Sequence, residues 1–187
     1  MTADRPLALG ISGSPSPDSS SRRVASAVLQ RLDGRGFETR TVDLAELPAD
    51  VLLARPDGGE GDAAVRAALE AVERASVLVV STPIYRATYT ALLKTIFDLM
   101  PQDALSGKVA VLIATGYGAG HLLAIDHGLR PLIASLGGLS AATGIYATAD
   151  HFDDGNPNPA LDGRIVQAAV EAAALSGAAG LSVAEAG

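Results

Sequence analysis

The chain has 187 residues, no cysteine and a formal net charge of −7. This length suits one α/β domain, the lack of cysteine excludes disulfides and thiolate metal sites, and a pI near 4.8 makes nucleic acid and anionic membranes poor partners. We expect neither a signal peptide nor a membrane span, because the first residues lack an apolar segment and no apolar run approaches about 20 residues. A cytoplasmic location fits these expectations.

The apolar pattern predicts strands that alternate with helices along the whole chain. In the first part it predicts a buried strand at 7–12, a helix at 19–32, a more exposed strand at 37–44, a surface connection at 48–61 and a helix at 61–74. In the second part it predicts a buried strand at 75–81, a helix at 89–100, a buried strand at 107–114, a helix at 121–136, a strand at 139–147, a polar loop at 150–159, a helix at 161–175 and a frayed C-terminal tail.

This alternation predicts one domain, with a core over about 7–175, built on a parallel sheet with helices on both faces. Ligands of such sheets bind beyond the carboxyl ends of the strands. Three segments that follow predicted strands carry unusual residues, namely 13–21, 82–87 and 115–120. We expect these segments to meet at one edge of the sheet.

Segment 13–21 is rich in serine, glycine and proline, and it joins a strand to a helix. It matches neither the dinucleotide fingerprint nor a Walker loop. Backbone N–H groups, serine hydroxyls and the helix dipole would converge there on an anion, most simply a phosphate monoester. The alternative is that Ser19 or Ser21 only caps the helix.

The other two segments suit a flat ligand. Pro83 stiffens the first of them, and Tyr85 either stacks on a ring or packs over the end of the sheet. Segment 115–120 has three glycines, which let the backbone approach a ligand or simply form a flexible turn. Together the three segments predict a phosphate pocket beside a slot for a planar ring.

Three motifs resemble those of NAD(P)H-dependent FMN reductases: Gly13-Ser14-Pro15 with its serines, TPIYRATYTALLK at 82–94, and 114–131 with its ATG, HLLAID and LRP elements. The similarity spans about 7–175 and is strongest to the reductase components of two-component alkanesulfonate and methanesulfonate monooxygenases. It implies a flavodoxin-like three-layer sandwich with strand order 2-1-3-4-5, FMN at the switch point between strands 1 and 3, and NAD(P)H as co-substrate.

The resemblance also implies roles for individual residues. The phosphate would be held by Ser14, Ser19 and Ser21, the isoalloxazine would be lined by Pro83, Ile84 and Tyr85, and Thr115 and Gly116 would contact it from the third segment.

Two features depart from the family pattern. Relatives often place arginine where this chain has Ser16 and Ser20, so either Arg22 or Arg23 would supply the positive charge. In the alkanesulfonate-type reductases a tyrosine occupies a π-helical bulge at the tetramer interface near the flavin. Here that position is His127, which is either a modulator of the site or an ordinary interface histidine.

No metal site is expected, because His121 and His127 are six residues apart and lie on different faces of a helix. The hydrophobic fraction of 48% and the small apolar residues of 89–100 and 121–136 predict a homodimer or homotetramer.

The predicted activity is hydride transfer from NAD(P)H to FMN, with reduced FMN passed to a partner monooxygenase and no general acid or base required. One alternative is a prosthetic-FMN enzyme that reduces quinones, azo dyes or chromate. Another is an electron-carrier flavodoxin without an NAD(P)H site, although the lack of tryptophan and the scarcity of carboxylates in the loops disfavour it.

Overall fold

A computed structural model describes residues 5–53 and 62–184. Its central sheet has the order β2-β1-β3-β5-β6, with β7 also paired to β5. The sheet strands are β1 (Leu7–Ser12), β2 (Glu38–Asp43), β3 (Ala75–Tyr85), β5 (Val109–Thr115), β6 (Leu139–Ser140) and β7 (Ile145–Ala147). All of these pair in parallel, which confirms the predicted strand order of a flavodoxin-like fold.

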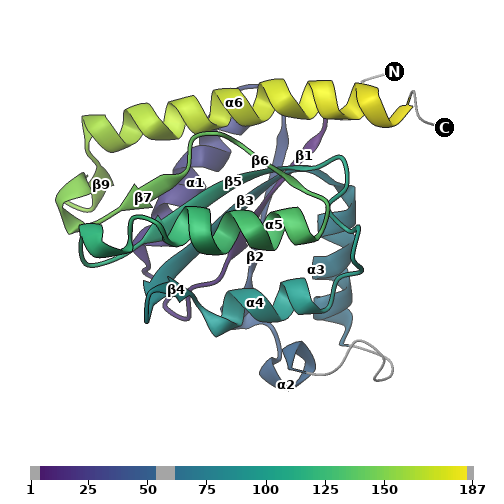
Figure 1. Cartoon of the computed structure of the whole chain (residues 1–187), viewed down its shortest axis with the longest axis horizontal. Coiled ribbons are helices and arrows are strands. Elements are labelled where there is room, and N and C mark those ends of the chain that lie inside the picture. Colours follow the sequence, from purple (N-terminus) through teal and green to yellow (C-terminus); the bar gives the residue numbers. More distant parts are fainter. Residues whose placement is uncertain (1–4, 54–61, 185–187) are drawn as a thin grey trace.

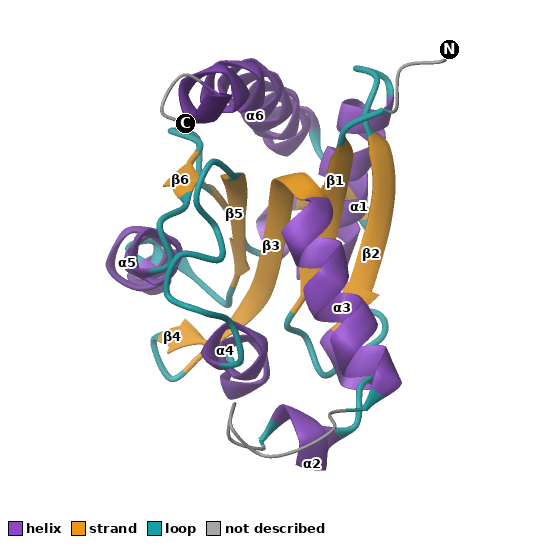
Figure 2. Cartoon of the chain, turned by 90° about the vertical axis from the view of Figure 1, so that its right-hand side faces the viewer, coloured by secondary structure: helices purple, strands orange, loops and turns teal. Residues whose placement is uncertain are grey.

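Helices cover both faces of this sheet (Figures 1 and 2). One face carries α1 (Ser20–Asp33) and α6 (Pro159–Ala184). The other carries α3 (Ala63–Arg74), α4 (Ala91–Asp98) and α5 (Arg130–Ser135), while the short α2 (Ala49–Leu52) lies beyond α4.

Alternate residues of the buried strands feed these two apolar layers. In β3, Val77 and Val79 pack with α1 and α6, whereas Leu78 and Val80 pack with the opposite layer. All four are fully buried, as expected for a parallel strand covered on both faces. The strand that leads to the candidate site is therefore packed on both of its faces.

The segment after β3 differs from the prediction, because the strand does not end at Ser81. It continues to Tyr85 and turns back as an antiparallel hairpin with β4 (Thr88–Tyr89). The two turn residues, Arg86 and Ala87, have φ values of 52° and 70°, the left-handed geometry of a two-residue hairpin. The following helix consequently begins at Ala91, after the N-cap Thr90, and not at 89.

The predicted helix at 121–136 is broken into three pieces. A 3₁₀ turn (Ala119–His121) comes first, a π-helical turn (Ile125–Leu129) contains His127, and α5 follows. Pro131 lacks an N–H, so the regular α-helical ladder cannot pass through it. The π-helical turn ends at Leu129, one residue before α5 begins with Arg130 and Pro131.

The last predicted strand, 139–147, is also broken, into β6 and β7. Between them, Arg130 donates hydrogen bonds to Ala141 O (2.8 Å) and Ala142 O (2.6 Å). The guanidinium thus binds carbonyl groups that an uninterrupted strand would use in the sheet.

The loop at 150–159 is more ordered than predicted. A 3₁₀ turn (Ala149–His151) leads into a small antiparallel hairpin of β8 (Phe152–Asp153) and β9 (Asn156–Pro157). The final helix, predicted at 161–175, runs from Pro159 to Ala184, and the expectation of a frayed C-terminal tail stays a prediction. A 3₁₀ turn (Leu44–Glu46) comes before the predicted connection at 48–61. That connection begins with α2, and its residues 54–61 lie outside the described residues.

Candidate flavin-sized pocket

A cavity of about 410 Å³ lies beyond the carboxyl ends of neighbouring strands. Its size falls in the usual range for small-molecule sites. The lining residues are Ser14, Ser16, Ser19, Ser20, Pro83, Ile84, Tyr85, Thr115, Gly116, Tyr117, Ala147, Thr148, Ala149 and Phe152. The three segments singled out in the sequence therefore meet, joined by a fourth wall at 147–152.

Seven of the eight predicted binding residues line this cavity, and Ser21 is the exception. Ser21 is fully buried, and its hydroxyl lies 3.1 Å from the hydroxyl of Ser19. A direct contact between Ser21 and a phosphate stays a prediction. Its observed contact is with Ser19, and Ser16 and Ser20 line the cavity in addition.

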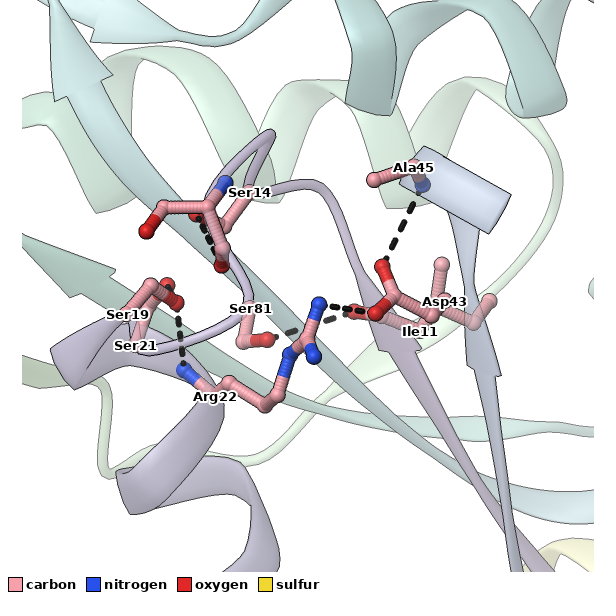
Figure 3. A network of polar contacts seen from close by, with 9 residues as sticks. Ile11, Ser14, Ser19, Ser21, Arg22, Asp43, Ala45 and Ser81 are labelled. Carbon is pink, nitrogen blue, oxygen red and sulfur yellow. Dashed lines mark hydrogen bonds and ion pairs between the residues drawn. The ribbon is translucent and has the colours of Figure 1, made fainter. Parts of the chain in front are cut away.

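The serine segment is held in place by its neighbours (Figure 3). The hydroxyl of Ser19 caps α1 by accepting from Arg22 N at 3.1 Å, and the Ser14 hydroxyl accepts from Ser16 N at 3.2 Å. At the start of the segment, the close approach of α4 requires glycine, because a Cβ on Gly13 would lie 2.6 Å from Leu93 Cβ.

The end of the cavity that the serines line has backbone N–H groups available as hydrogen-bond donors. Among the described residues, no protein acceptor takes the backbone N–H groups of Ser20 and Ser21, which form the first turn of α1. Such N–H groups carry the positive end of the helix dipole. Together with the neighbouring hydroxyls, they form the donor set that a phosphate monoester needs.

The other end of the cavity is lined mainly by apolar and aromatic side chains. The side chain of Tyr85 is half exposed at its edge, whereas Ile84 is buried. Opposite them, Gly116 N donates to Ala147 O at 3.0 Å, which fixes the start of the glycine-rich segment. The N–H groups of Tyr117 and Gly118 have no acceptor within the described chain, so they remain available to a ligand.

Tyr146 supports this glycine-rich segment from behind. Its hydroxyl donates to Gly118 O at 2.7 Å. Burial raises the pKa of the Tyr146 phenol, so it stays protonated as this bond requires. A Cβ on Gly116 would lie only 2.4 Å from the Tyr146 hydroxyl oxygen, so Tyr146 can occupy this position only because residue 116 is glycine.

Nothing in the sequence predicted that residues 147–152 form a fourth wall of the cavity. The His151 ring nitrogen Nδ1 accepts a hydrogen bond from Thr148 N (3.1 Å) and lies 2.9 Å from the Thr148 hydroxyl. These bonds fix the turn that places Ala149 and Phe152 in the cavity wall. Only the aromatic residue in a polar loop marked this segment in the sequence.

Three further predictions concern His127, metal binding and membrane spans. His127 is exposed on the π-helical turn and does not line the cavity. The part of the chain that the structure describes holds no cluster of three or more metal-ligand residues. Within that same part, every helix is too short or too polar to cross a bilayer.

Comparison with known proteins gives a consistent result. The family described as NADPH-dependent FMN reductase matches residues 6–153. An FMN reductase (NADPH) from Pseudomonas putida is 38% identical over 75% of this chain and 70% of its own length. The NADH-dependent FMN reductase SfnF from Pseudomonas fluorescens is 36% identical over 92% of this chain and 94% of its own.

Solved structures agree with these sequence matches. An NADH:FMN oxidoreductase, EMOB, in its apo form superimposes with a TM-score of 0.82 at 32% identity. The match covers 90% of this chain and 88% of that one.

Proposed function

The chain belongs to the NADPH-dependent FMN reductase family, and from this premise we propose that it transfers a hydride from NADH or NADPH to FMN in the cavity described above. Reduced FMN then passes to a flavin-dependent monooxygenase. This last step rests on the motif resemblance to the reductases of two-component monooxygenases.

One observation carries the proposal: the cavity has hydrogen-bond donors at one end, mostly apolar lining residues at the other, and no charged side chain among its described lining residues. Among the described lining residues there is no Asp, Glu, His, Lys or Arg. General acid–base hydrolysis and transfer reactions need such groups. Hydride transfer between a nicotinamide and a flavin does not, because the cofactors carry that chemistry.

The residues fit FMN at both ends. We assign the phosphate to the free N–H groups of Ser20 and Ser21 and the hydroxyls of Ser14 and Ser19, and the ring to the slot between 83–85 and 115–117. When bound, FMN supplies the hydride-accepting ring. The free N–H group of Tyr117, a residue that lines the cavity, would supply a donor for the negative charge that reduction places on that ring.

We also propose that a second copy of the chain covers the mouth of the cavity. Tyr85 and Tyr117 are 52% and 107% exposed, and Leu122 and Leu123 are 56% and 59% exposed. These residues lie on the segments that frame the cavity and lead into the π-helical turn, and clustered exposed apolar side chains mark interaction surfaces. Leu123→Asp should shift the protein to a smaller species in sedimentation, whereas Leu53→Asp, on a more exposed leucine near α2, should not.

The activity is tested by the loss of NADH or NADPH absorbance at 340 nm in the presence of FMN or riboflavin. The proposal predicts turnover with FMN and a sequential rate law in which FMN behaves as a substrate. A ping-pong rate law with a quinone, and flavin that survives gel filtration, would support a prosthetic-FMN enzyme. No oxidation with either nicotinamide would contradict the proposal.

A further inference from the structure

The first turn of α1 carries two adjacent arginines with different surroundings. Arg22 forms an ion pair with Asp43 at the end of β2. The Arg22 side chain is 24% exposed and that of Asp43 10%, so each charge neutralises the other away from the cavity. Figure 3 shows the guanidinium of Arg22 directed toward Asp43 and not toward the serines.

Arg23 has only uncharged partners. Its Nη2 donates to the hydroxyl of Ser20 and its Nη1 to Gly155 O, both at 3.3 Å. Its guanidinium carbon lies 5.7 Å from the ring centre of Phe152, within the range of a cation–π contact. No carboxylate among the described residues forms an ion pair with it.

These contacts place a positive charge, without an ion-pair partner among the described residues, beside the donor end of the cavity. Both Ser20 and Phe152 line the cavity, so the Arg23 guanidinium joins two of its walls. Ser20 also contributes one of the free N–H groups of the helix start. A phosphate bound there would find hydroxyls, N–H groups and one cation, whereas the Arg22 charge is already paired.

We propose that Arg23 is the cation that pairs with the flavin phosphate and that it sets the preference for FMN over riboflavin. The inference rests on the proposed function, since it takes FMN as the ligand. It resolves the choice between Arg22 and Arg23 that the sequence left open. It also links the phosphate to the β8–β9 hairpin, because the same guanidinium holds Phe152 and Gly155.

The test is a comparison of dissociation constants for FMN and riboflavin, measured by quenching of flavin fluorescence without nicotinamide. Arg23→Gln should weaken FMN binding about 10-fold or more, the effect of losing one charge-assisted contact, and change riboflavin binding less than about 3-fold by the same reasoning. Arg23→Lys should retain part of the preference for FMN, since the charge remains.

Arg22→Gln is the matched control. It lowers stability because Asp43 loses its ion-pair partner and keeps the hydrogen bond from Ala45 N, so circular dichroism must show it folded at the temperature used. It should then leave the ratio of FMN to riboflavin affinity near that of the wild type. In the wild type, FMN affinity should also fall with added salt, and riboflavin affinity should not.

Three results would overturn the inference. Equal weakening of both flavins by Arg23→Gln would mean that Arg23 only ties the hairpin to α1. Loss of the preference in Arg22→Gln, but not in Arg23→Gln, would give the role to Arg22. A salt-independent FMN affinity in the wild type would exclude an exposed cation at the phosphate. If the wild type bound neither flavin, the proposed function itself would fail, which is a separate outcome.

Discussion

The contact between Gly116 and Tyr146 gives the sharpest prediction about the ring slot. A methyl group at Gly116 would lie 2.4 Å from the Tyr146 hydroxyl oxygen, about 1 Å closer than an ordinary van der Waals contact. The backbone of Gly116 is held by its bond to Ala147 O, so the tyrosine must move. Its hydroxyl then loses the 2.7 Å bond to Gly118 O.

We therefore expect Gly116→Ala to lower the free energy of unfolding by about 2–4 kcal/mol, from overpacking and the lost hydrogen bond. Tyr146→Phe alone should cost about 1 kcal/mol. In the Gly116→Ala/Tyr146→Phe double variant the hydroxyl oxygen is gone, and the atom nearest to the new Cβ is Cζ of residue 146, at 3.3 Å. The loss of unfolding free energy in the double variant should therefore be smaller than the sum of the two single losses by at least about 1 kcal/mol.

Urea unfolding of the four proteins measures these values, provided that the m-values agree. Gly118→Ala is the control, because a Cβ there meets nothing within 4 Å and it should change stability by less than about 0.5 kcal/mol. Gly116→Ala should weaken FMN and riboflavin equally, since the slot holds the ring. Additive costs in the double variant would refute the reasoning.

Three other predictions follow from single side chains. Ser19→Ala should cost about 1 kcal/mol through loss of the α1 cap and weaken FMN more than riboflavin in fluorescence titrations; equal weakening would argue for a purely structural serine. Burial alone would raise the pKa of Glu171, but hydrogen bonds from Thr143 and Gln167 and the charge of Arg130 lower it below the ordinary value of 4.5. The ionised carboxylate therefore stabilises the fold at pH values above 4.5. Glu171→Gln should therefore reduce stability at pH 7, by about 1 kcal/mol after allowing for partial exposure, and the difference from wild type should vanish as the pH falls through the lowered pKa; a difference that persists in acid would be inconsistent. His127→Tyr should leave the unfolding free energy within about 0.5 kcal/mol, because the side chain is exposed, and should alter subunit dissociation in sedimentation; unchanged assembly would make His127 a bystander.

The sequence was most informative where local pattern and packing agree. The apolar residues of β1 and β3 predicted strands buried on both faces. Of the two serines considered as a cap for the first helix, Ser19 and Ser21, it is Ser19 that caps α1. The parallel topology then followed from the alternation of elements. That topology also predicted that segments 13–21, 82–87 and 115–120 would meet, and residues of all three line one cavity.

Features that depend on contacts between distant residues were not predictable. The break between β6 and β7 depends on Arg130, which binds carbonyl groups more than ten residues along the chain. The hairpin after β3 places Arg86 and Ala87 in a conformation that neither residue type favours.

The fourth wall of the cavity has the same origin. Phe152 reaches it through the small β8–β9 hairpin, which Arg23 contacts from 132 residues earlier at Gly155. Nothing local in a polar, proline-rich stretch indicates that contact. The different roles of Arg22 and Arg23 likewise depend on partners that only the folded chain brings near.

A crystal structure of the complex with FMN tests the central claim most directly. We expect the flavin ring between Tyr85 and the 115–117 segment, with its phosphate on the N–H groups of Ser20 and Ser21. A phosphate bound away from the first turn of α1, or a ring outside this slot, would contradict it.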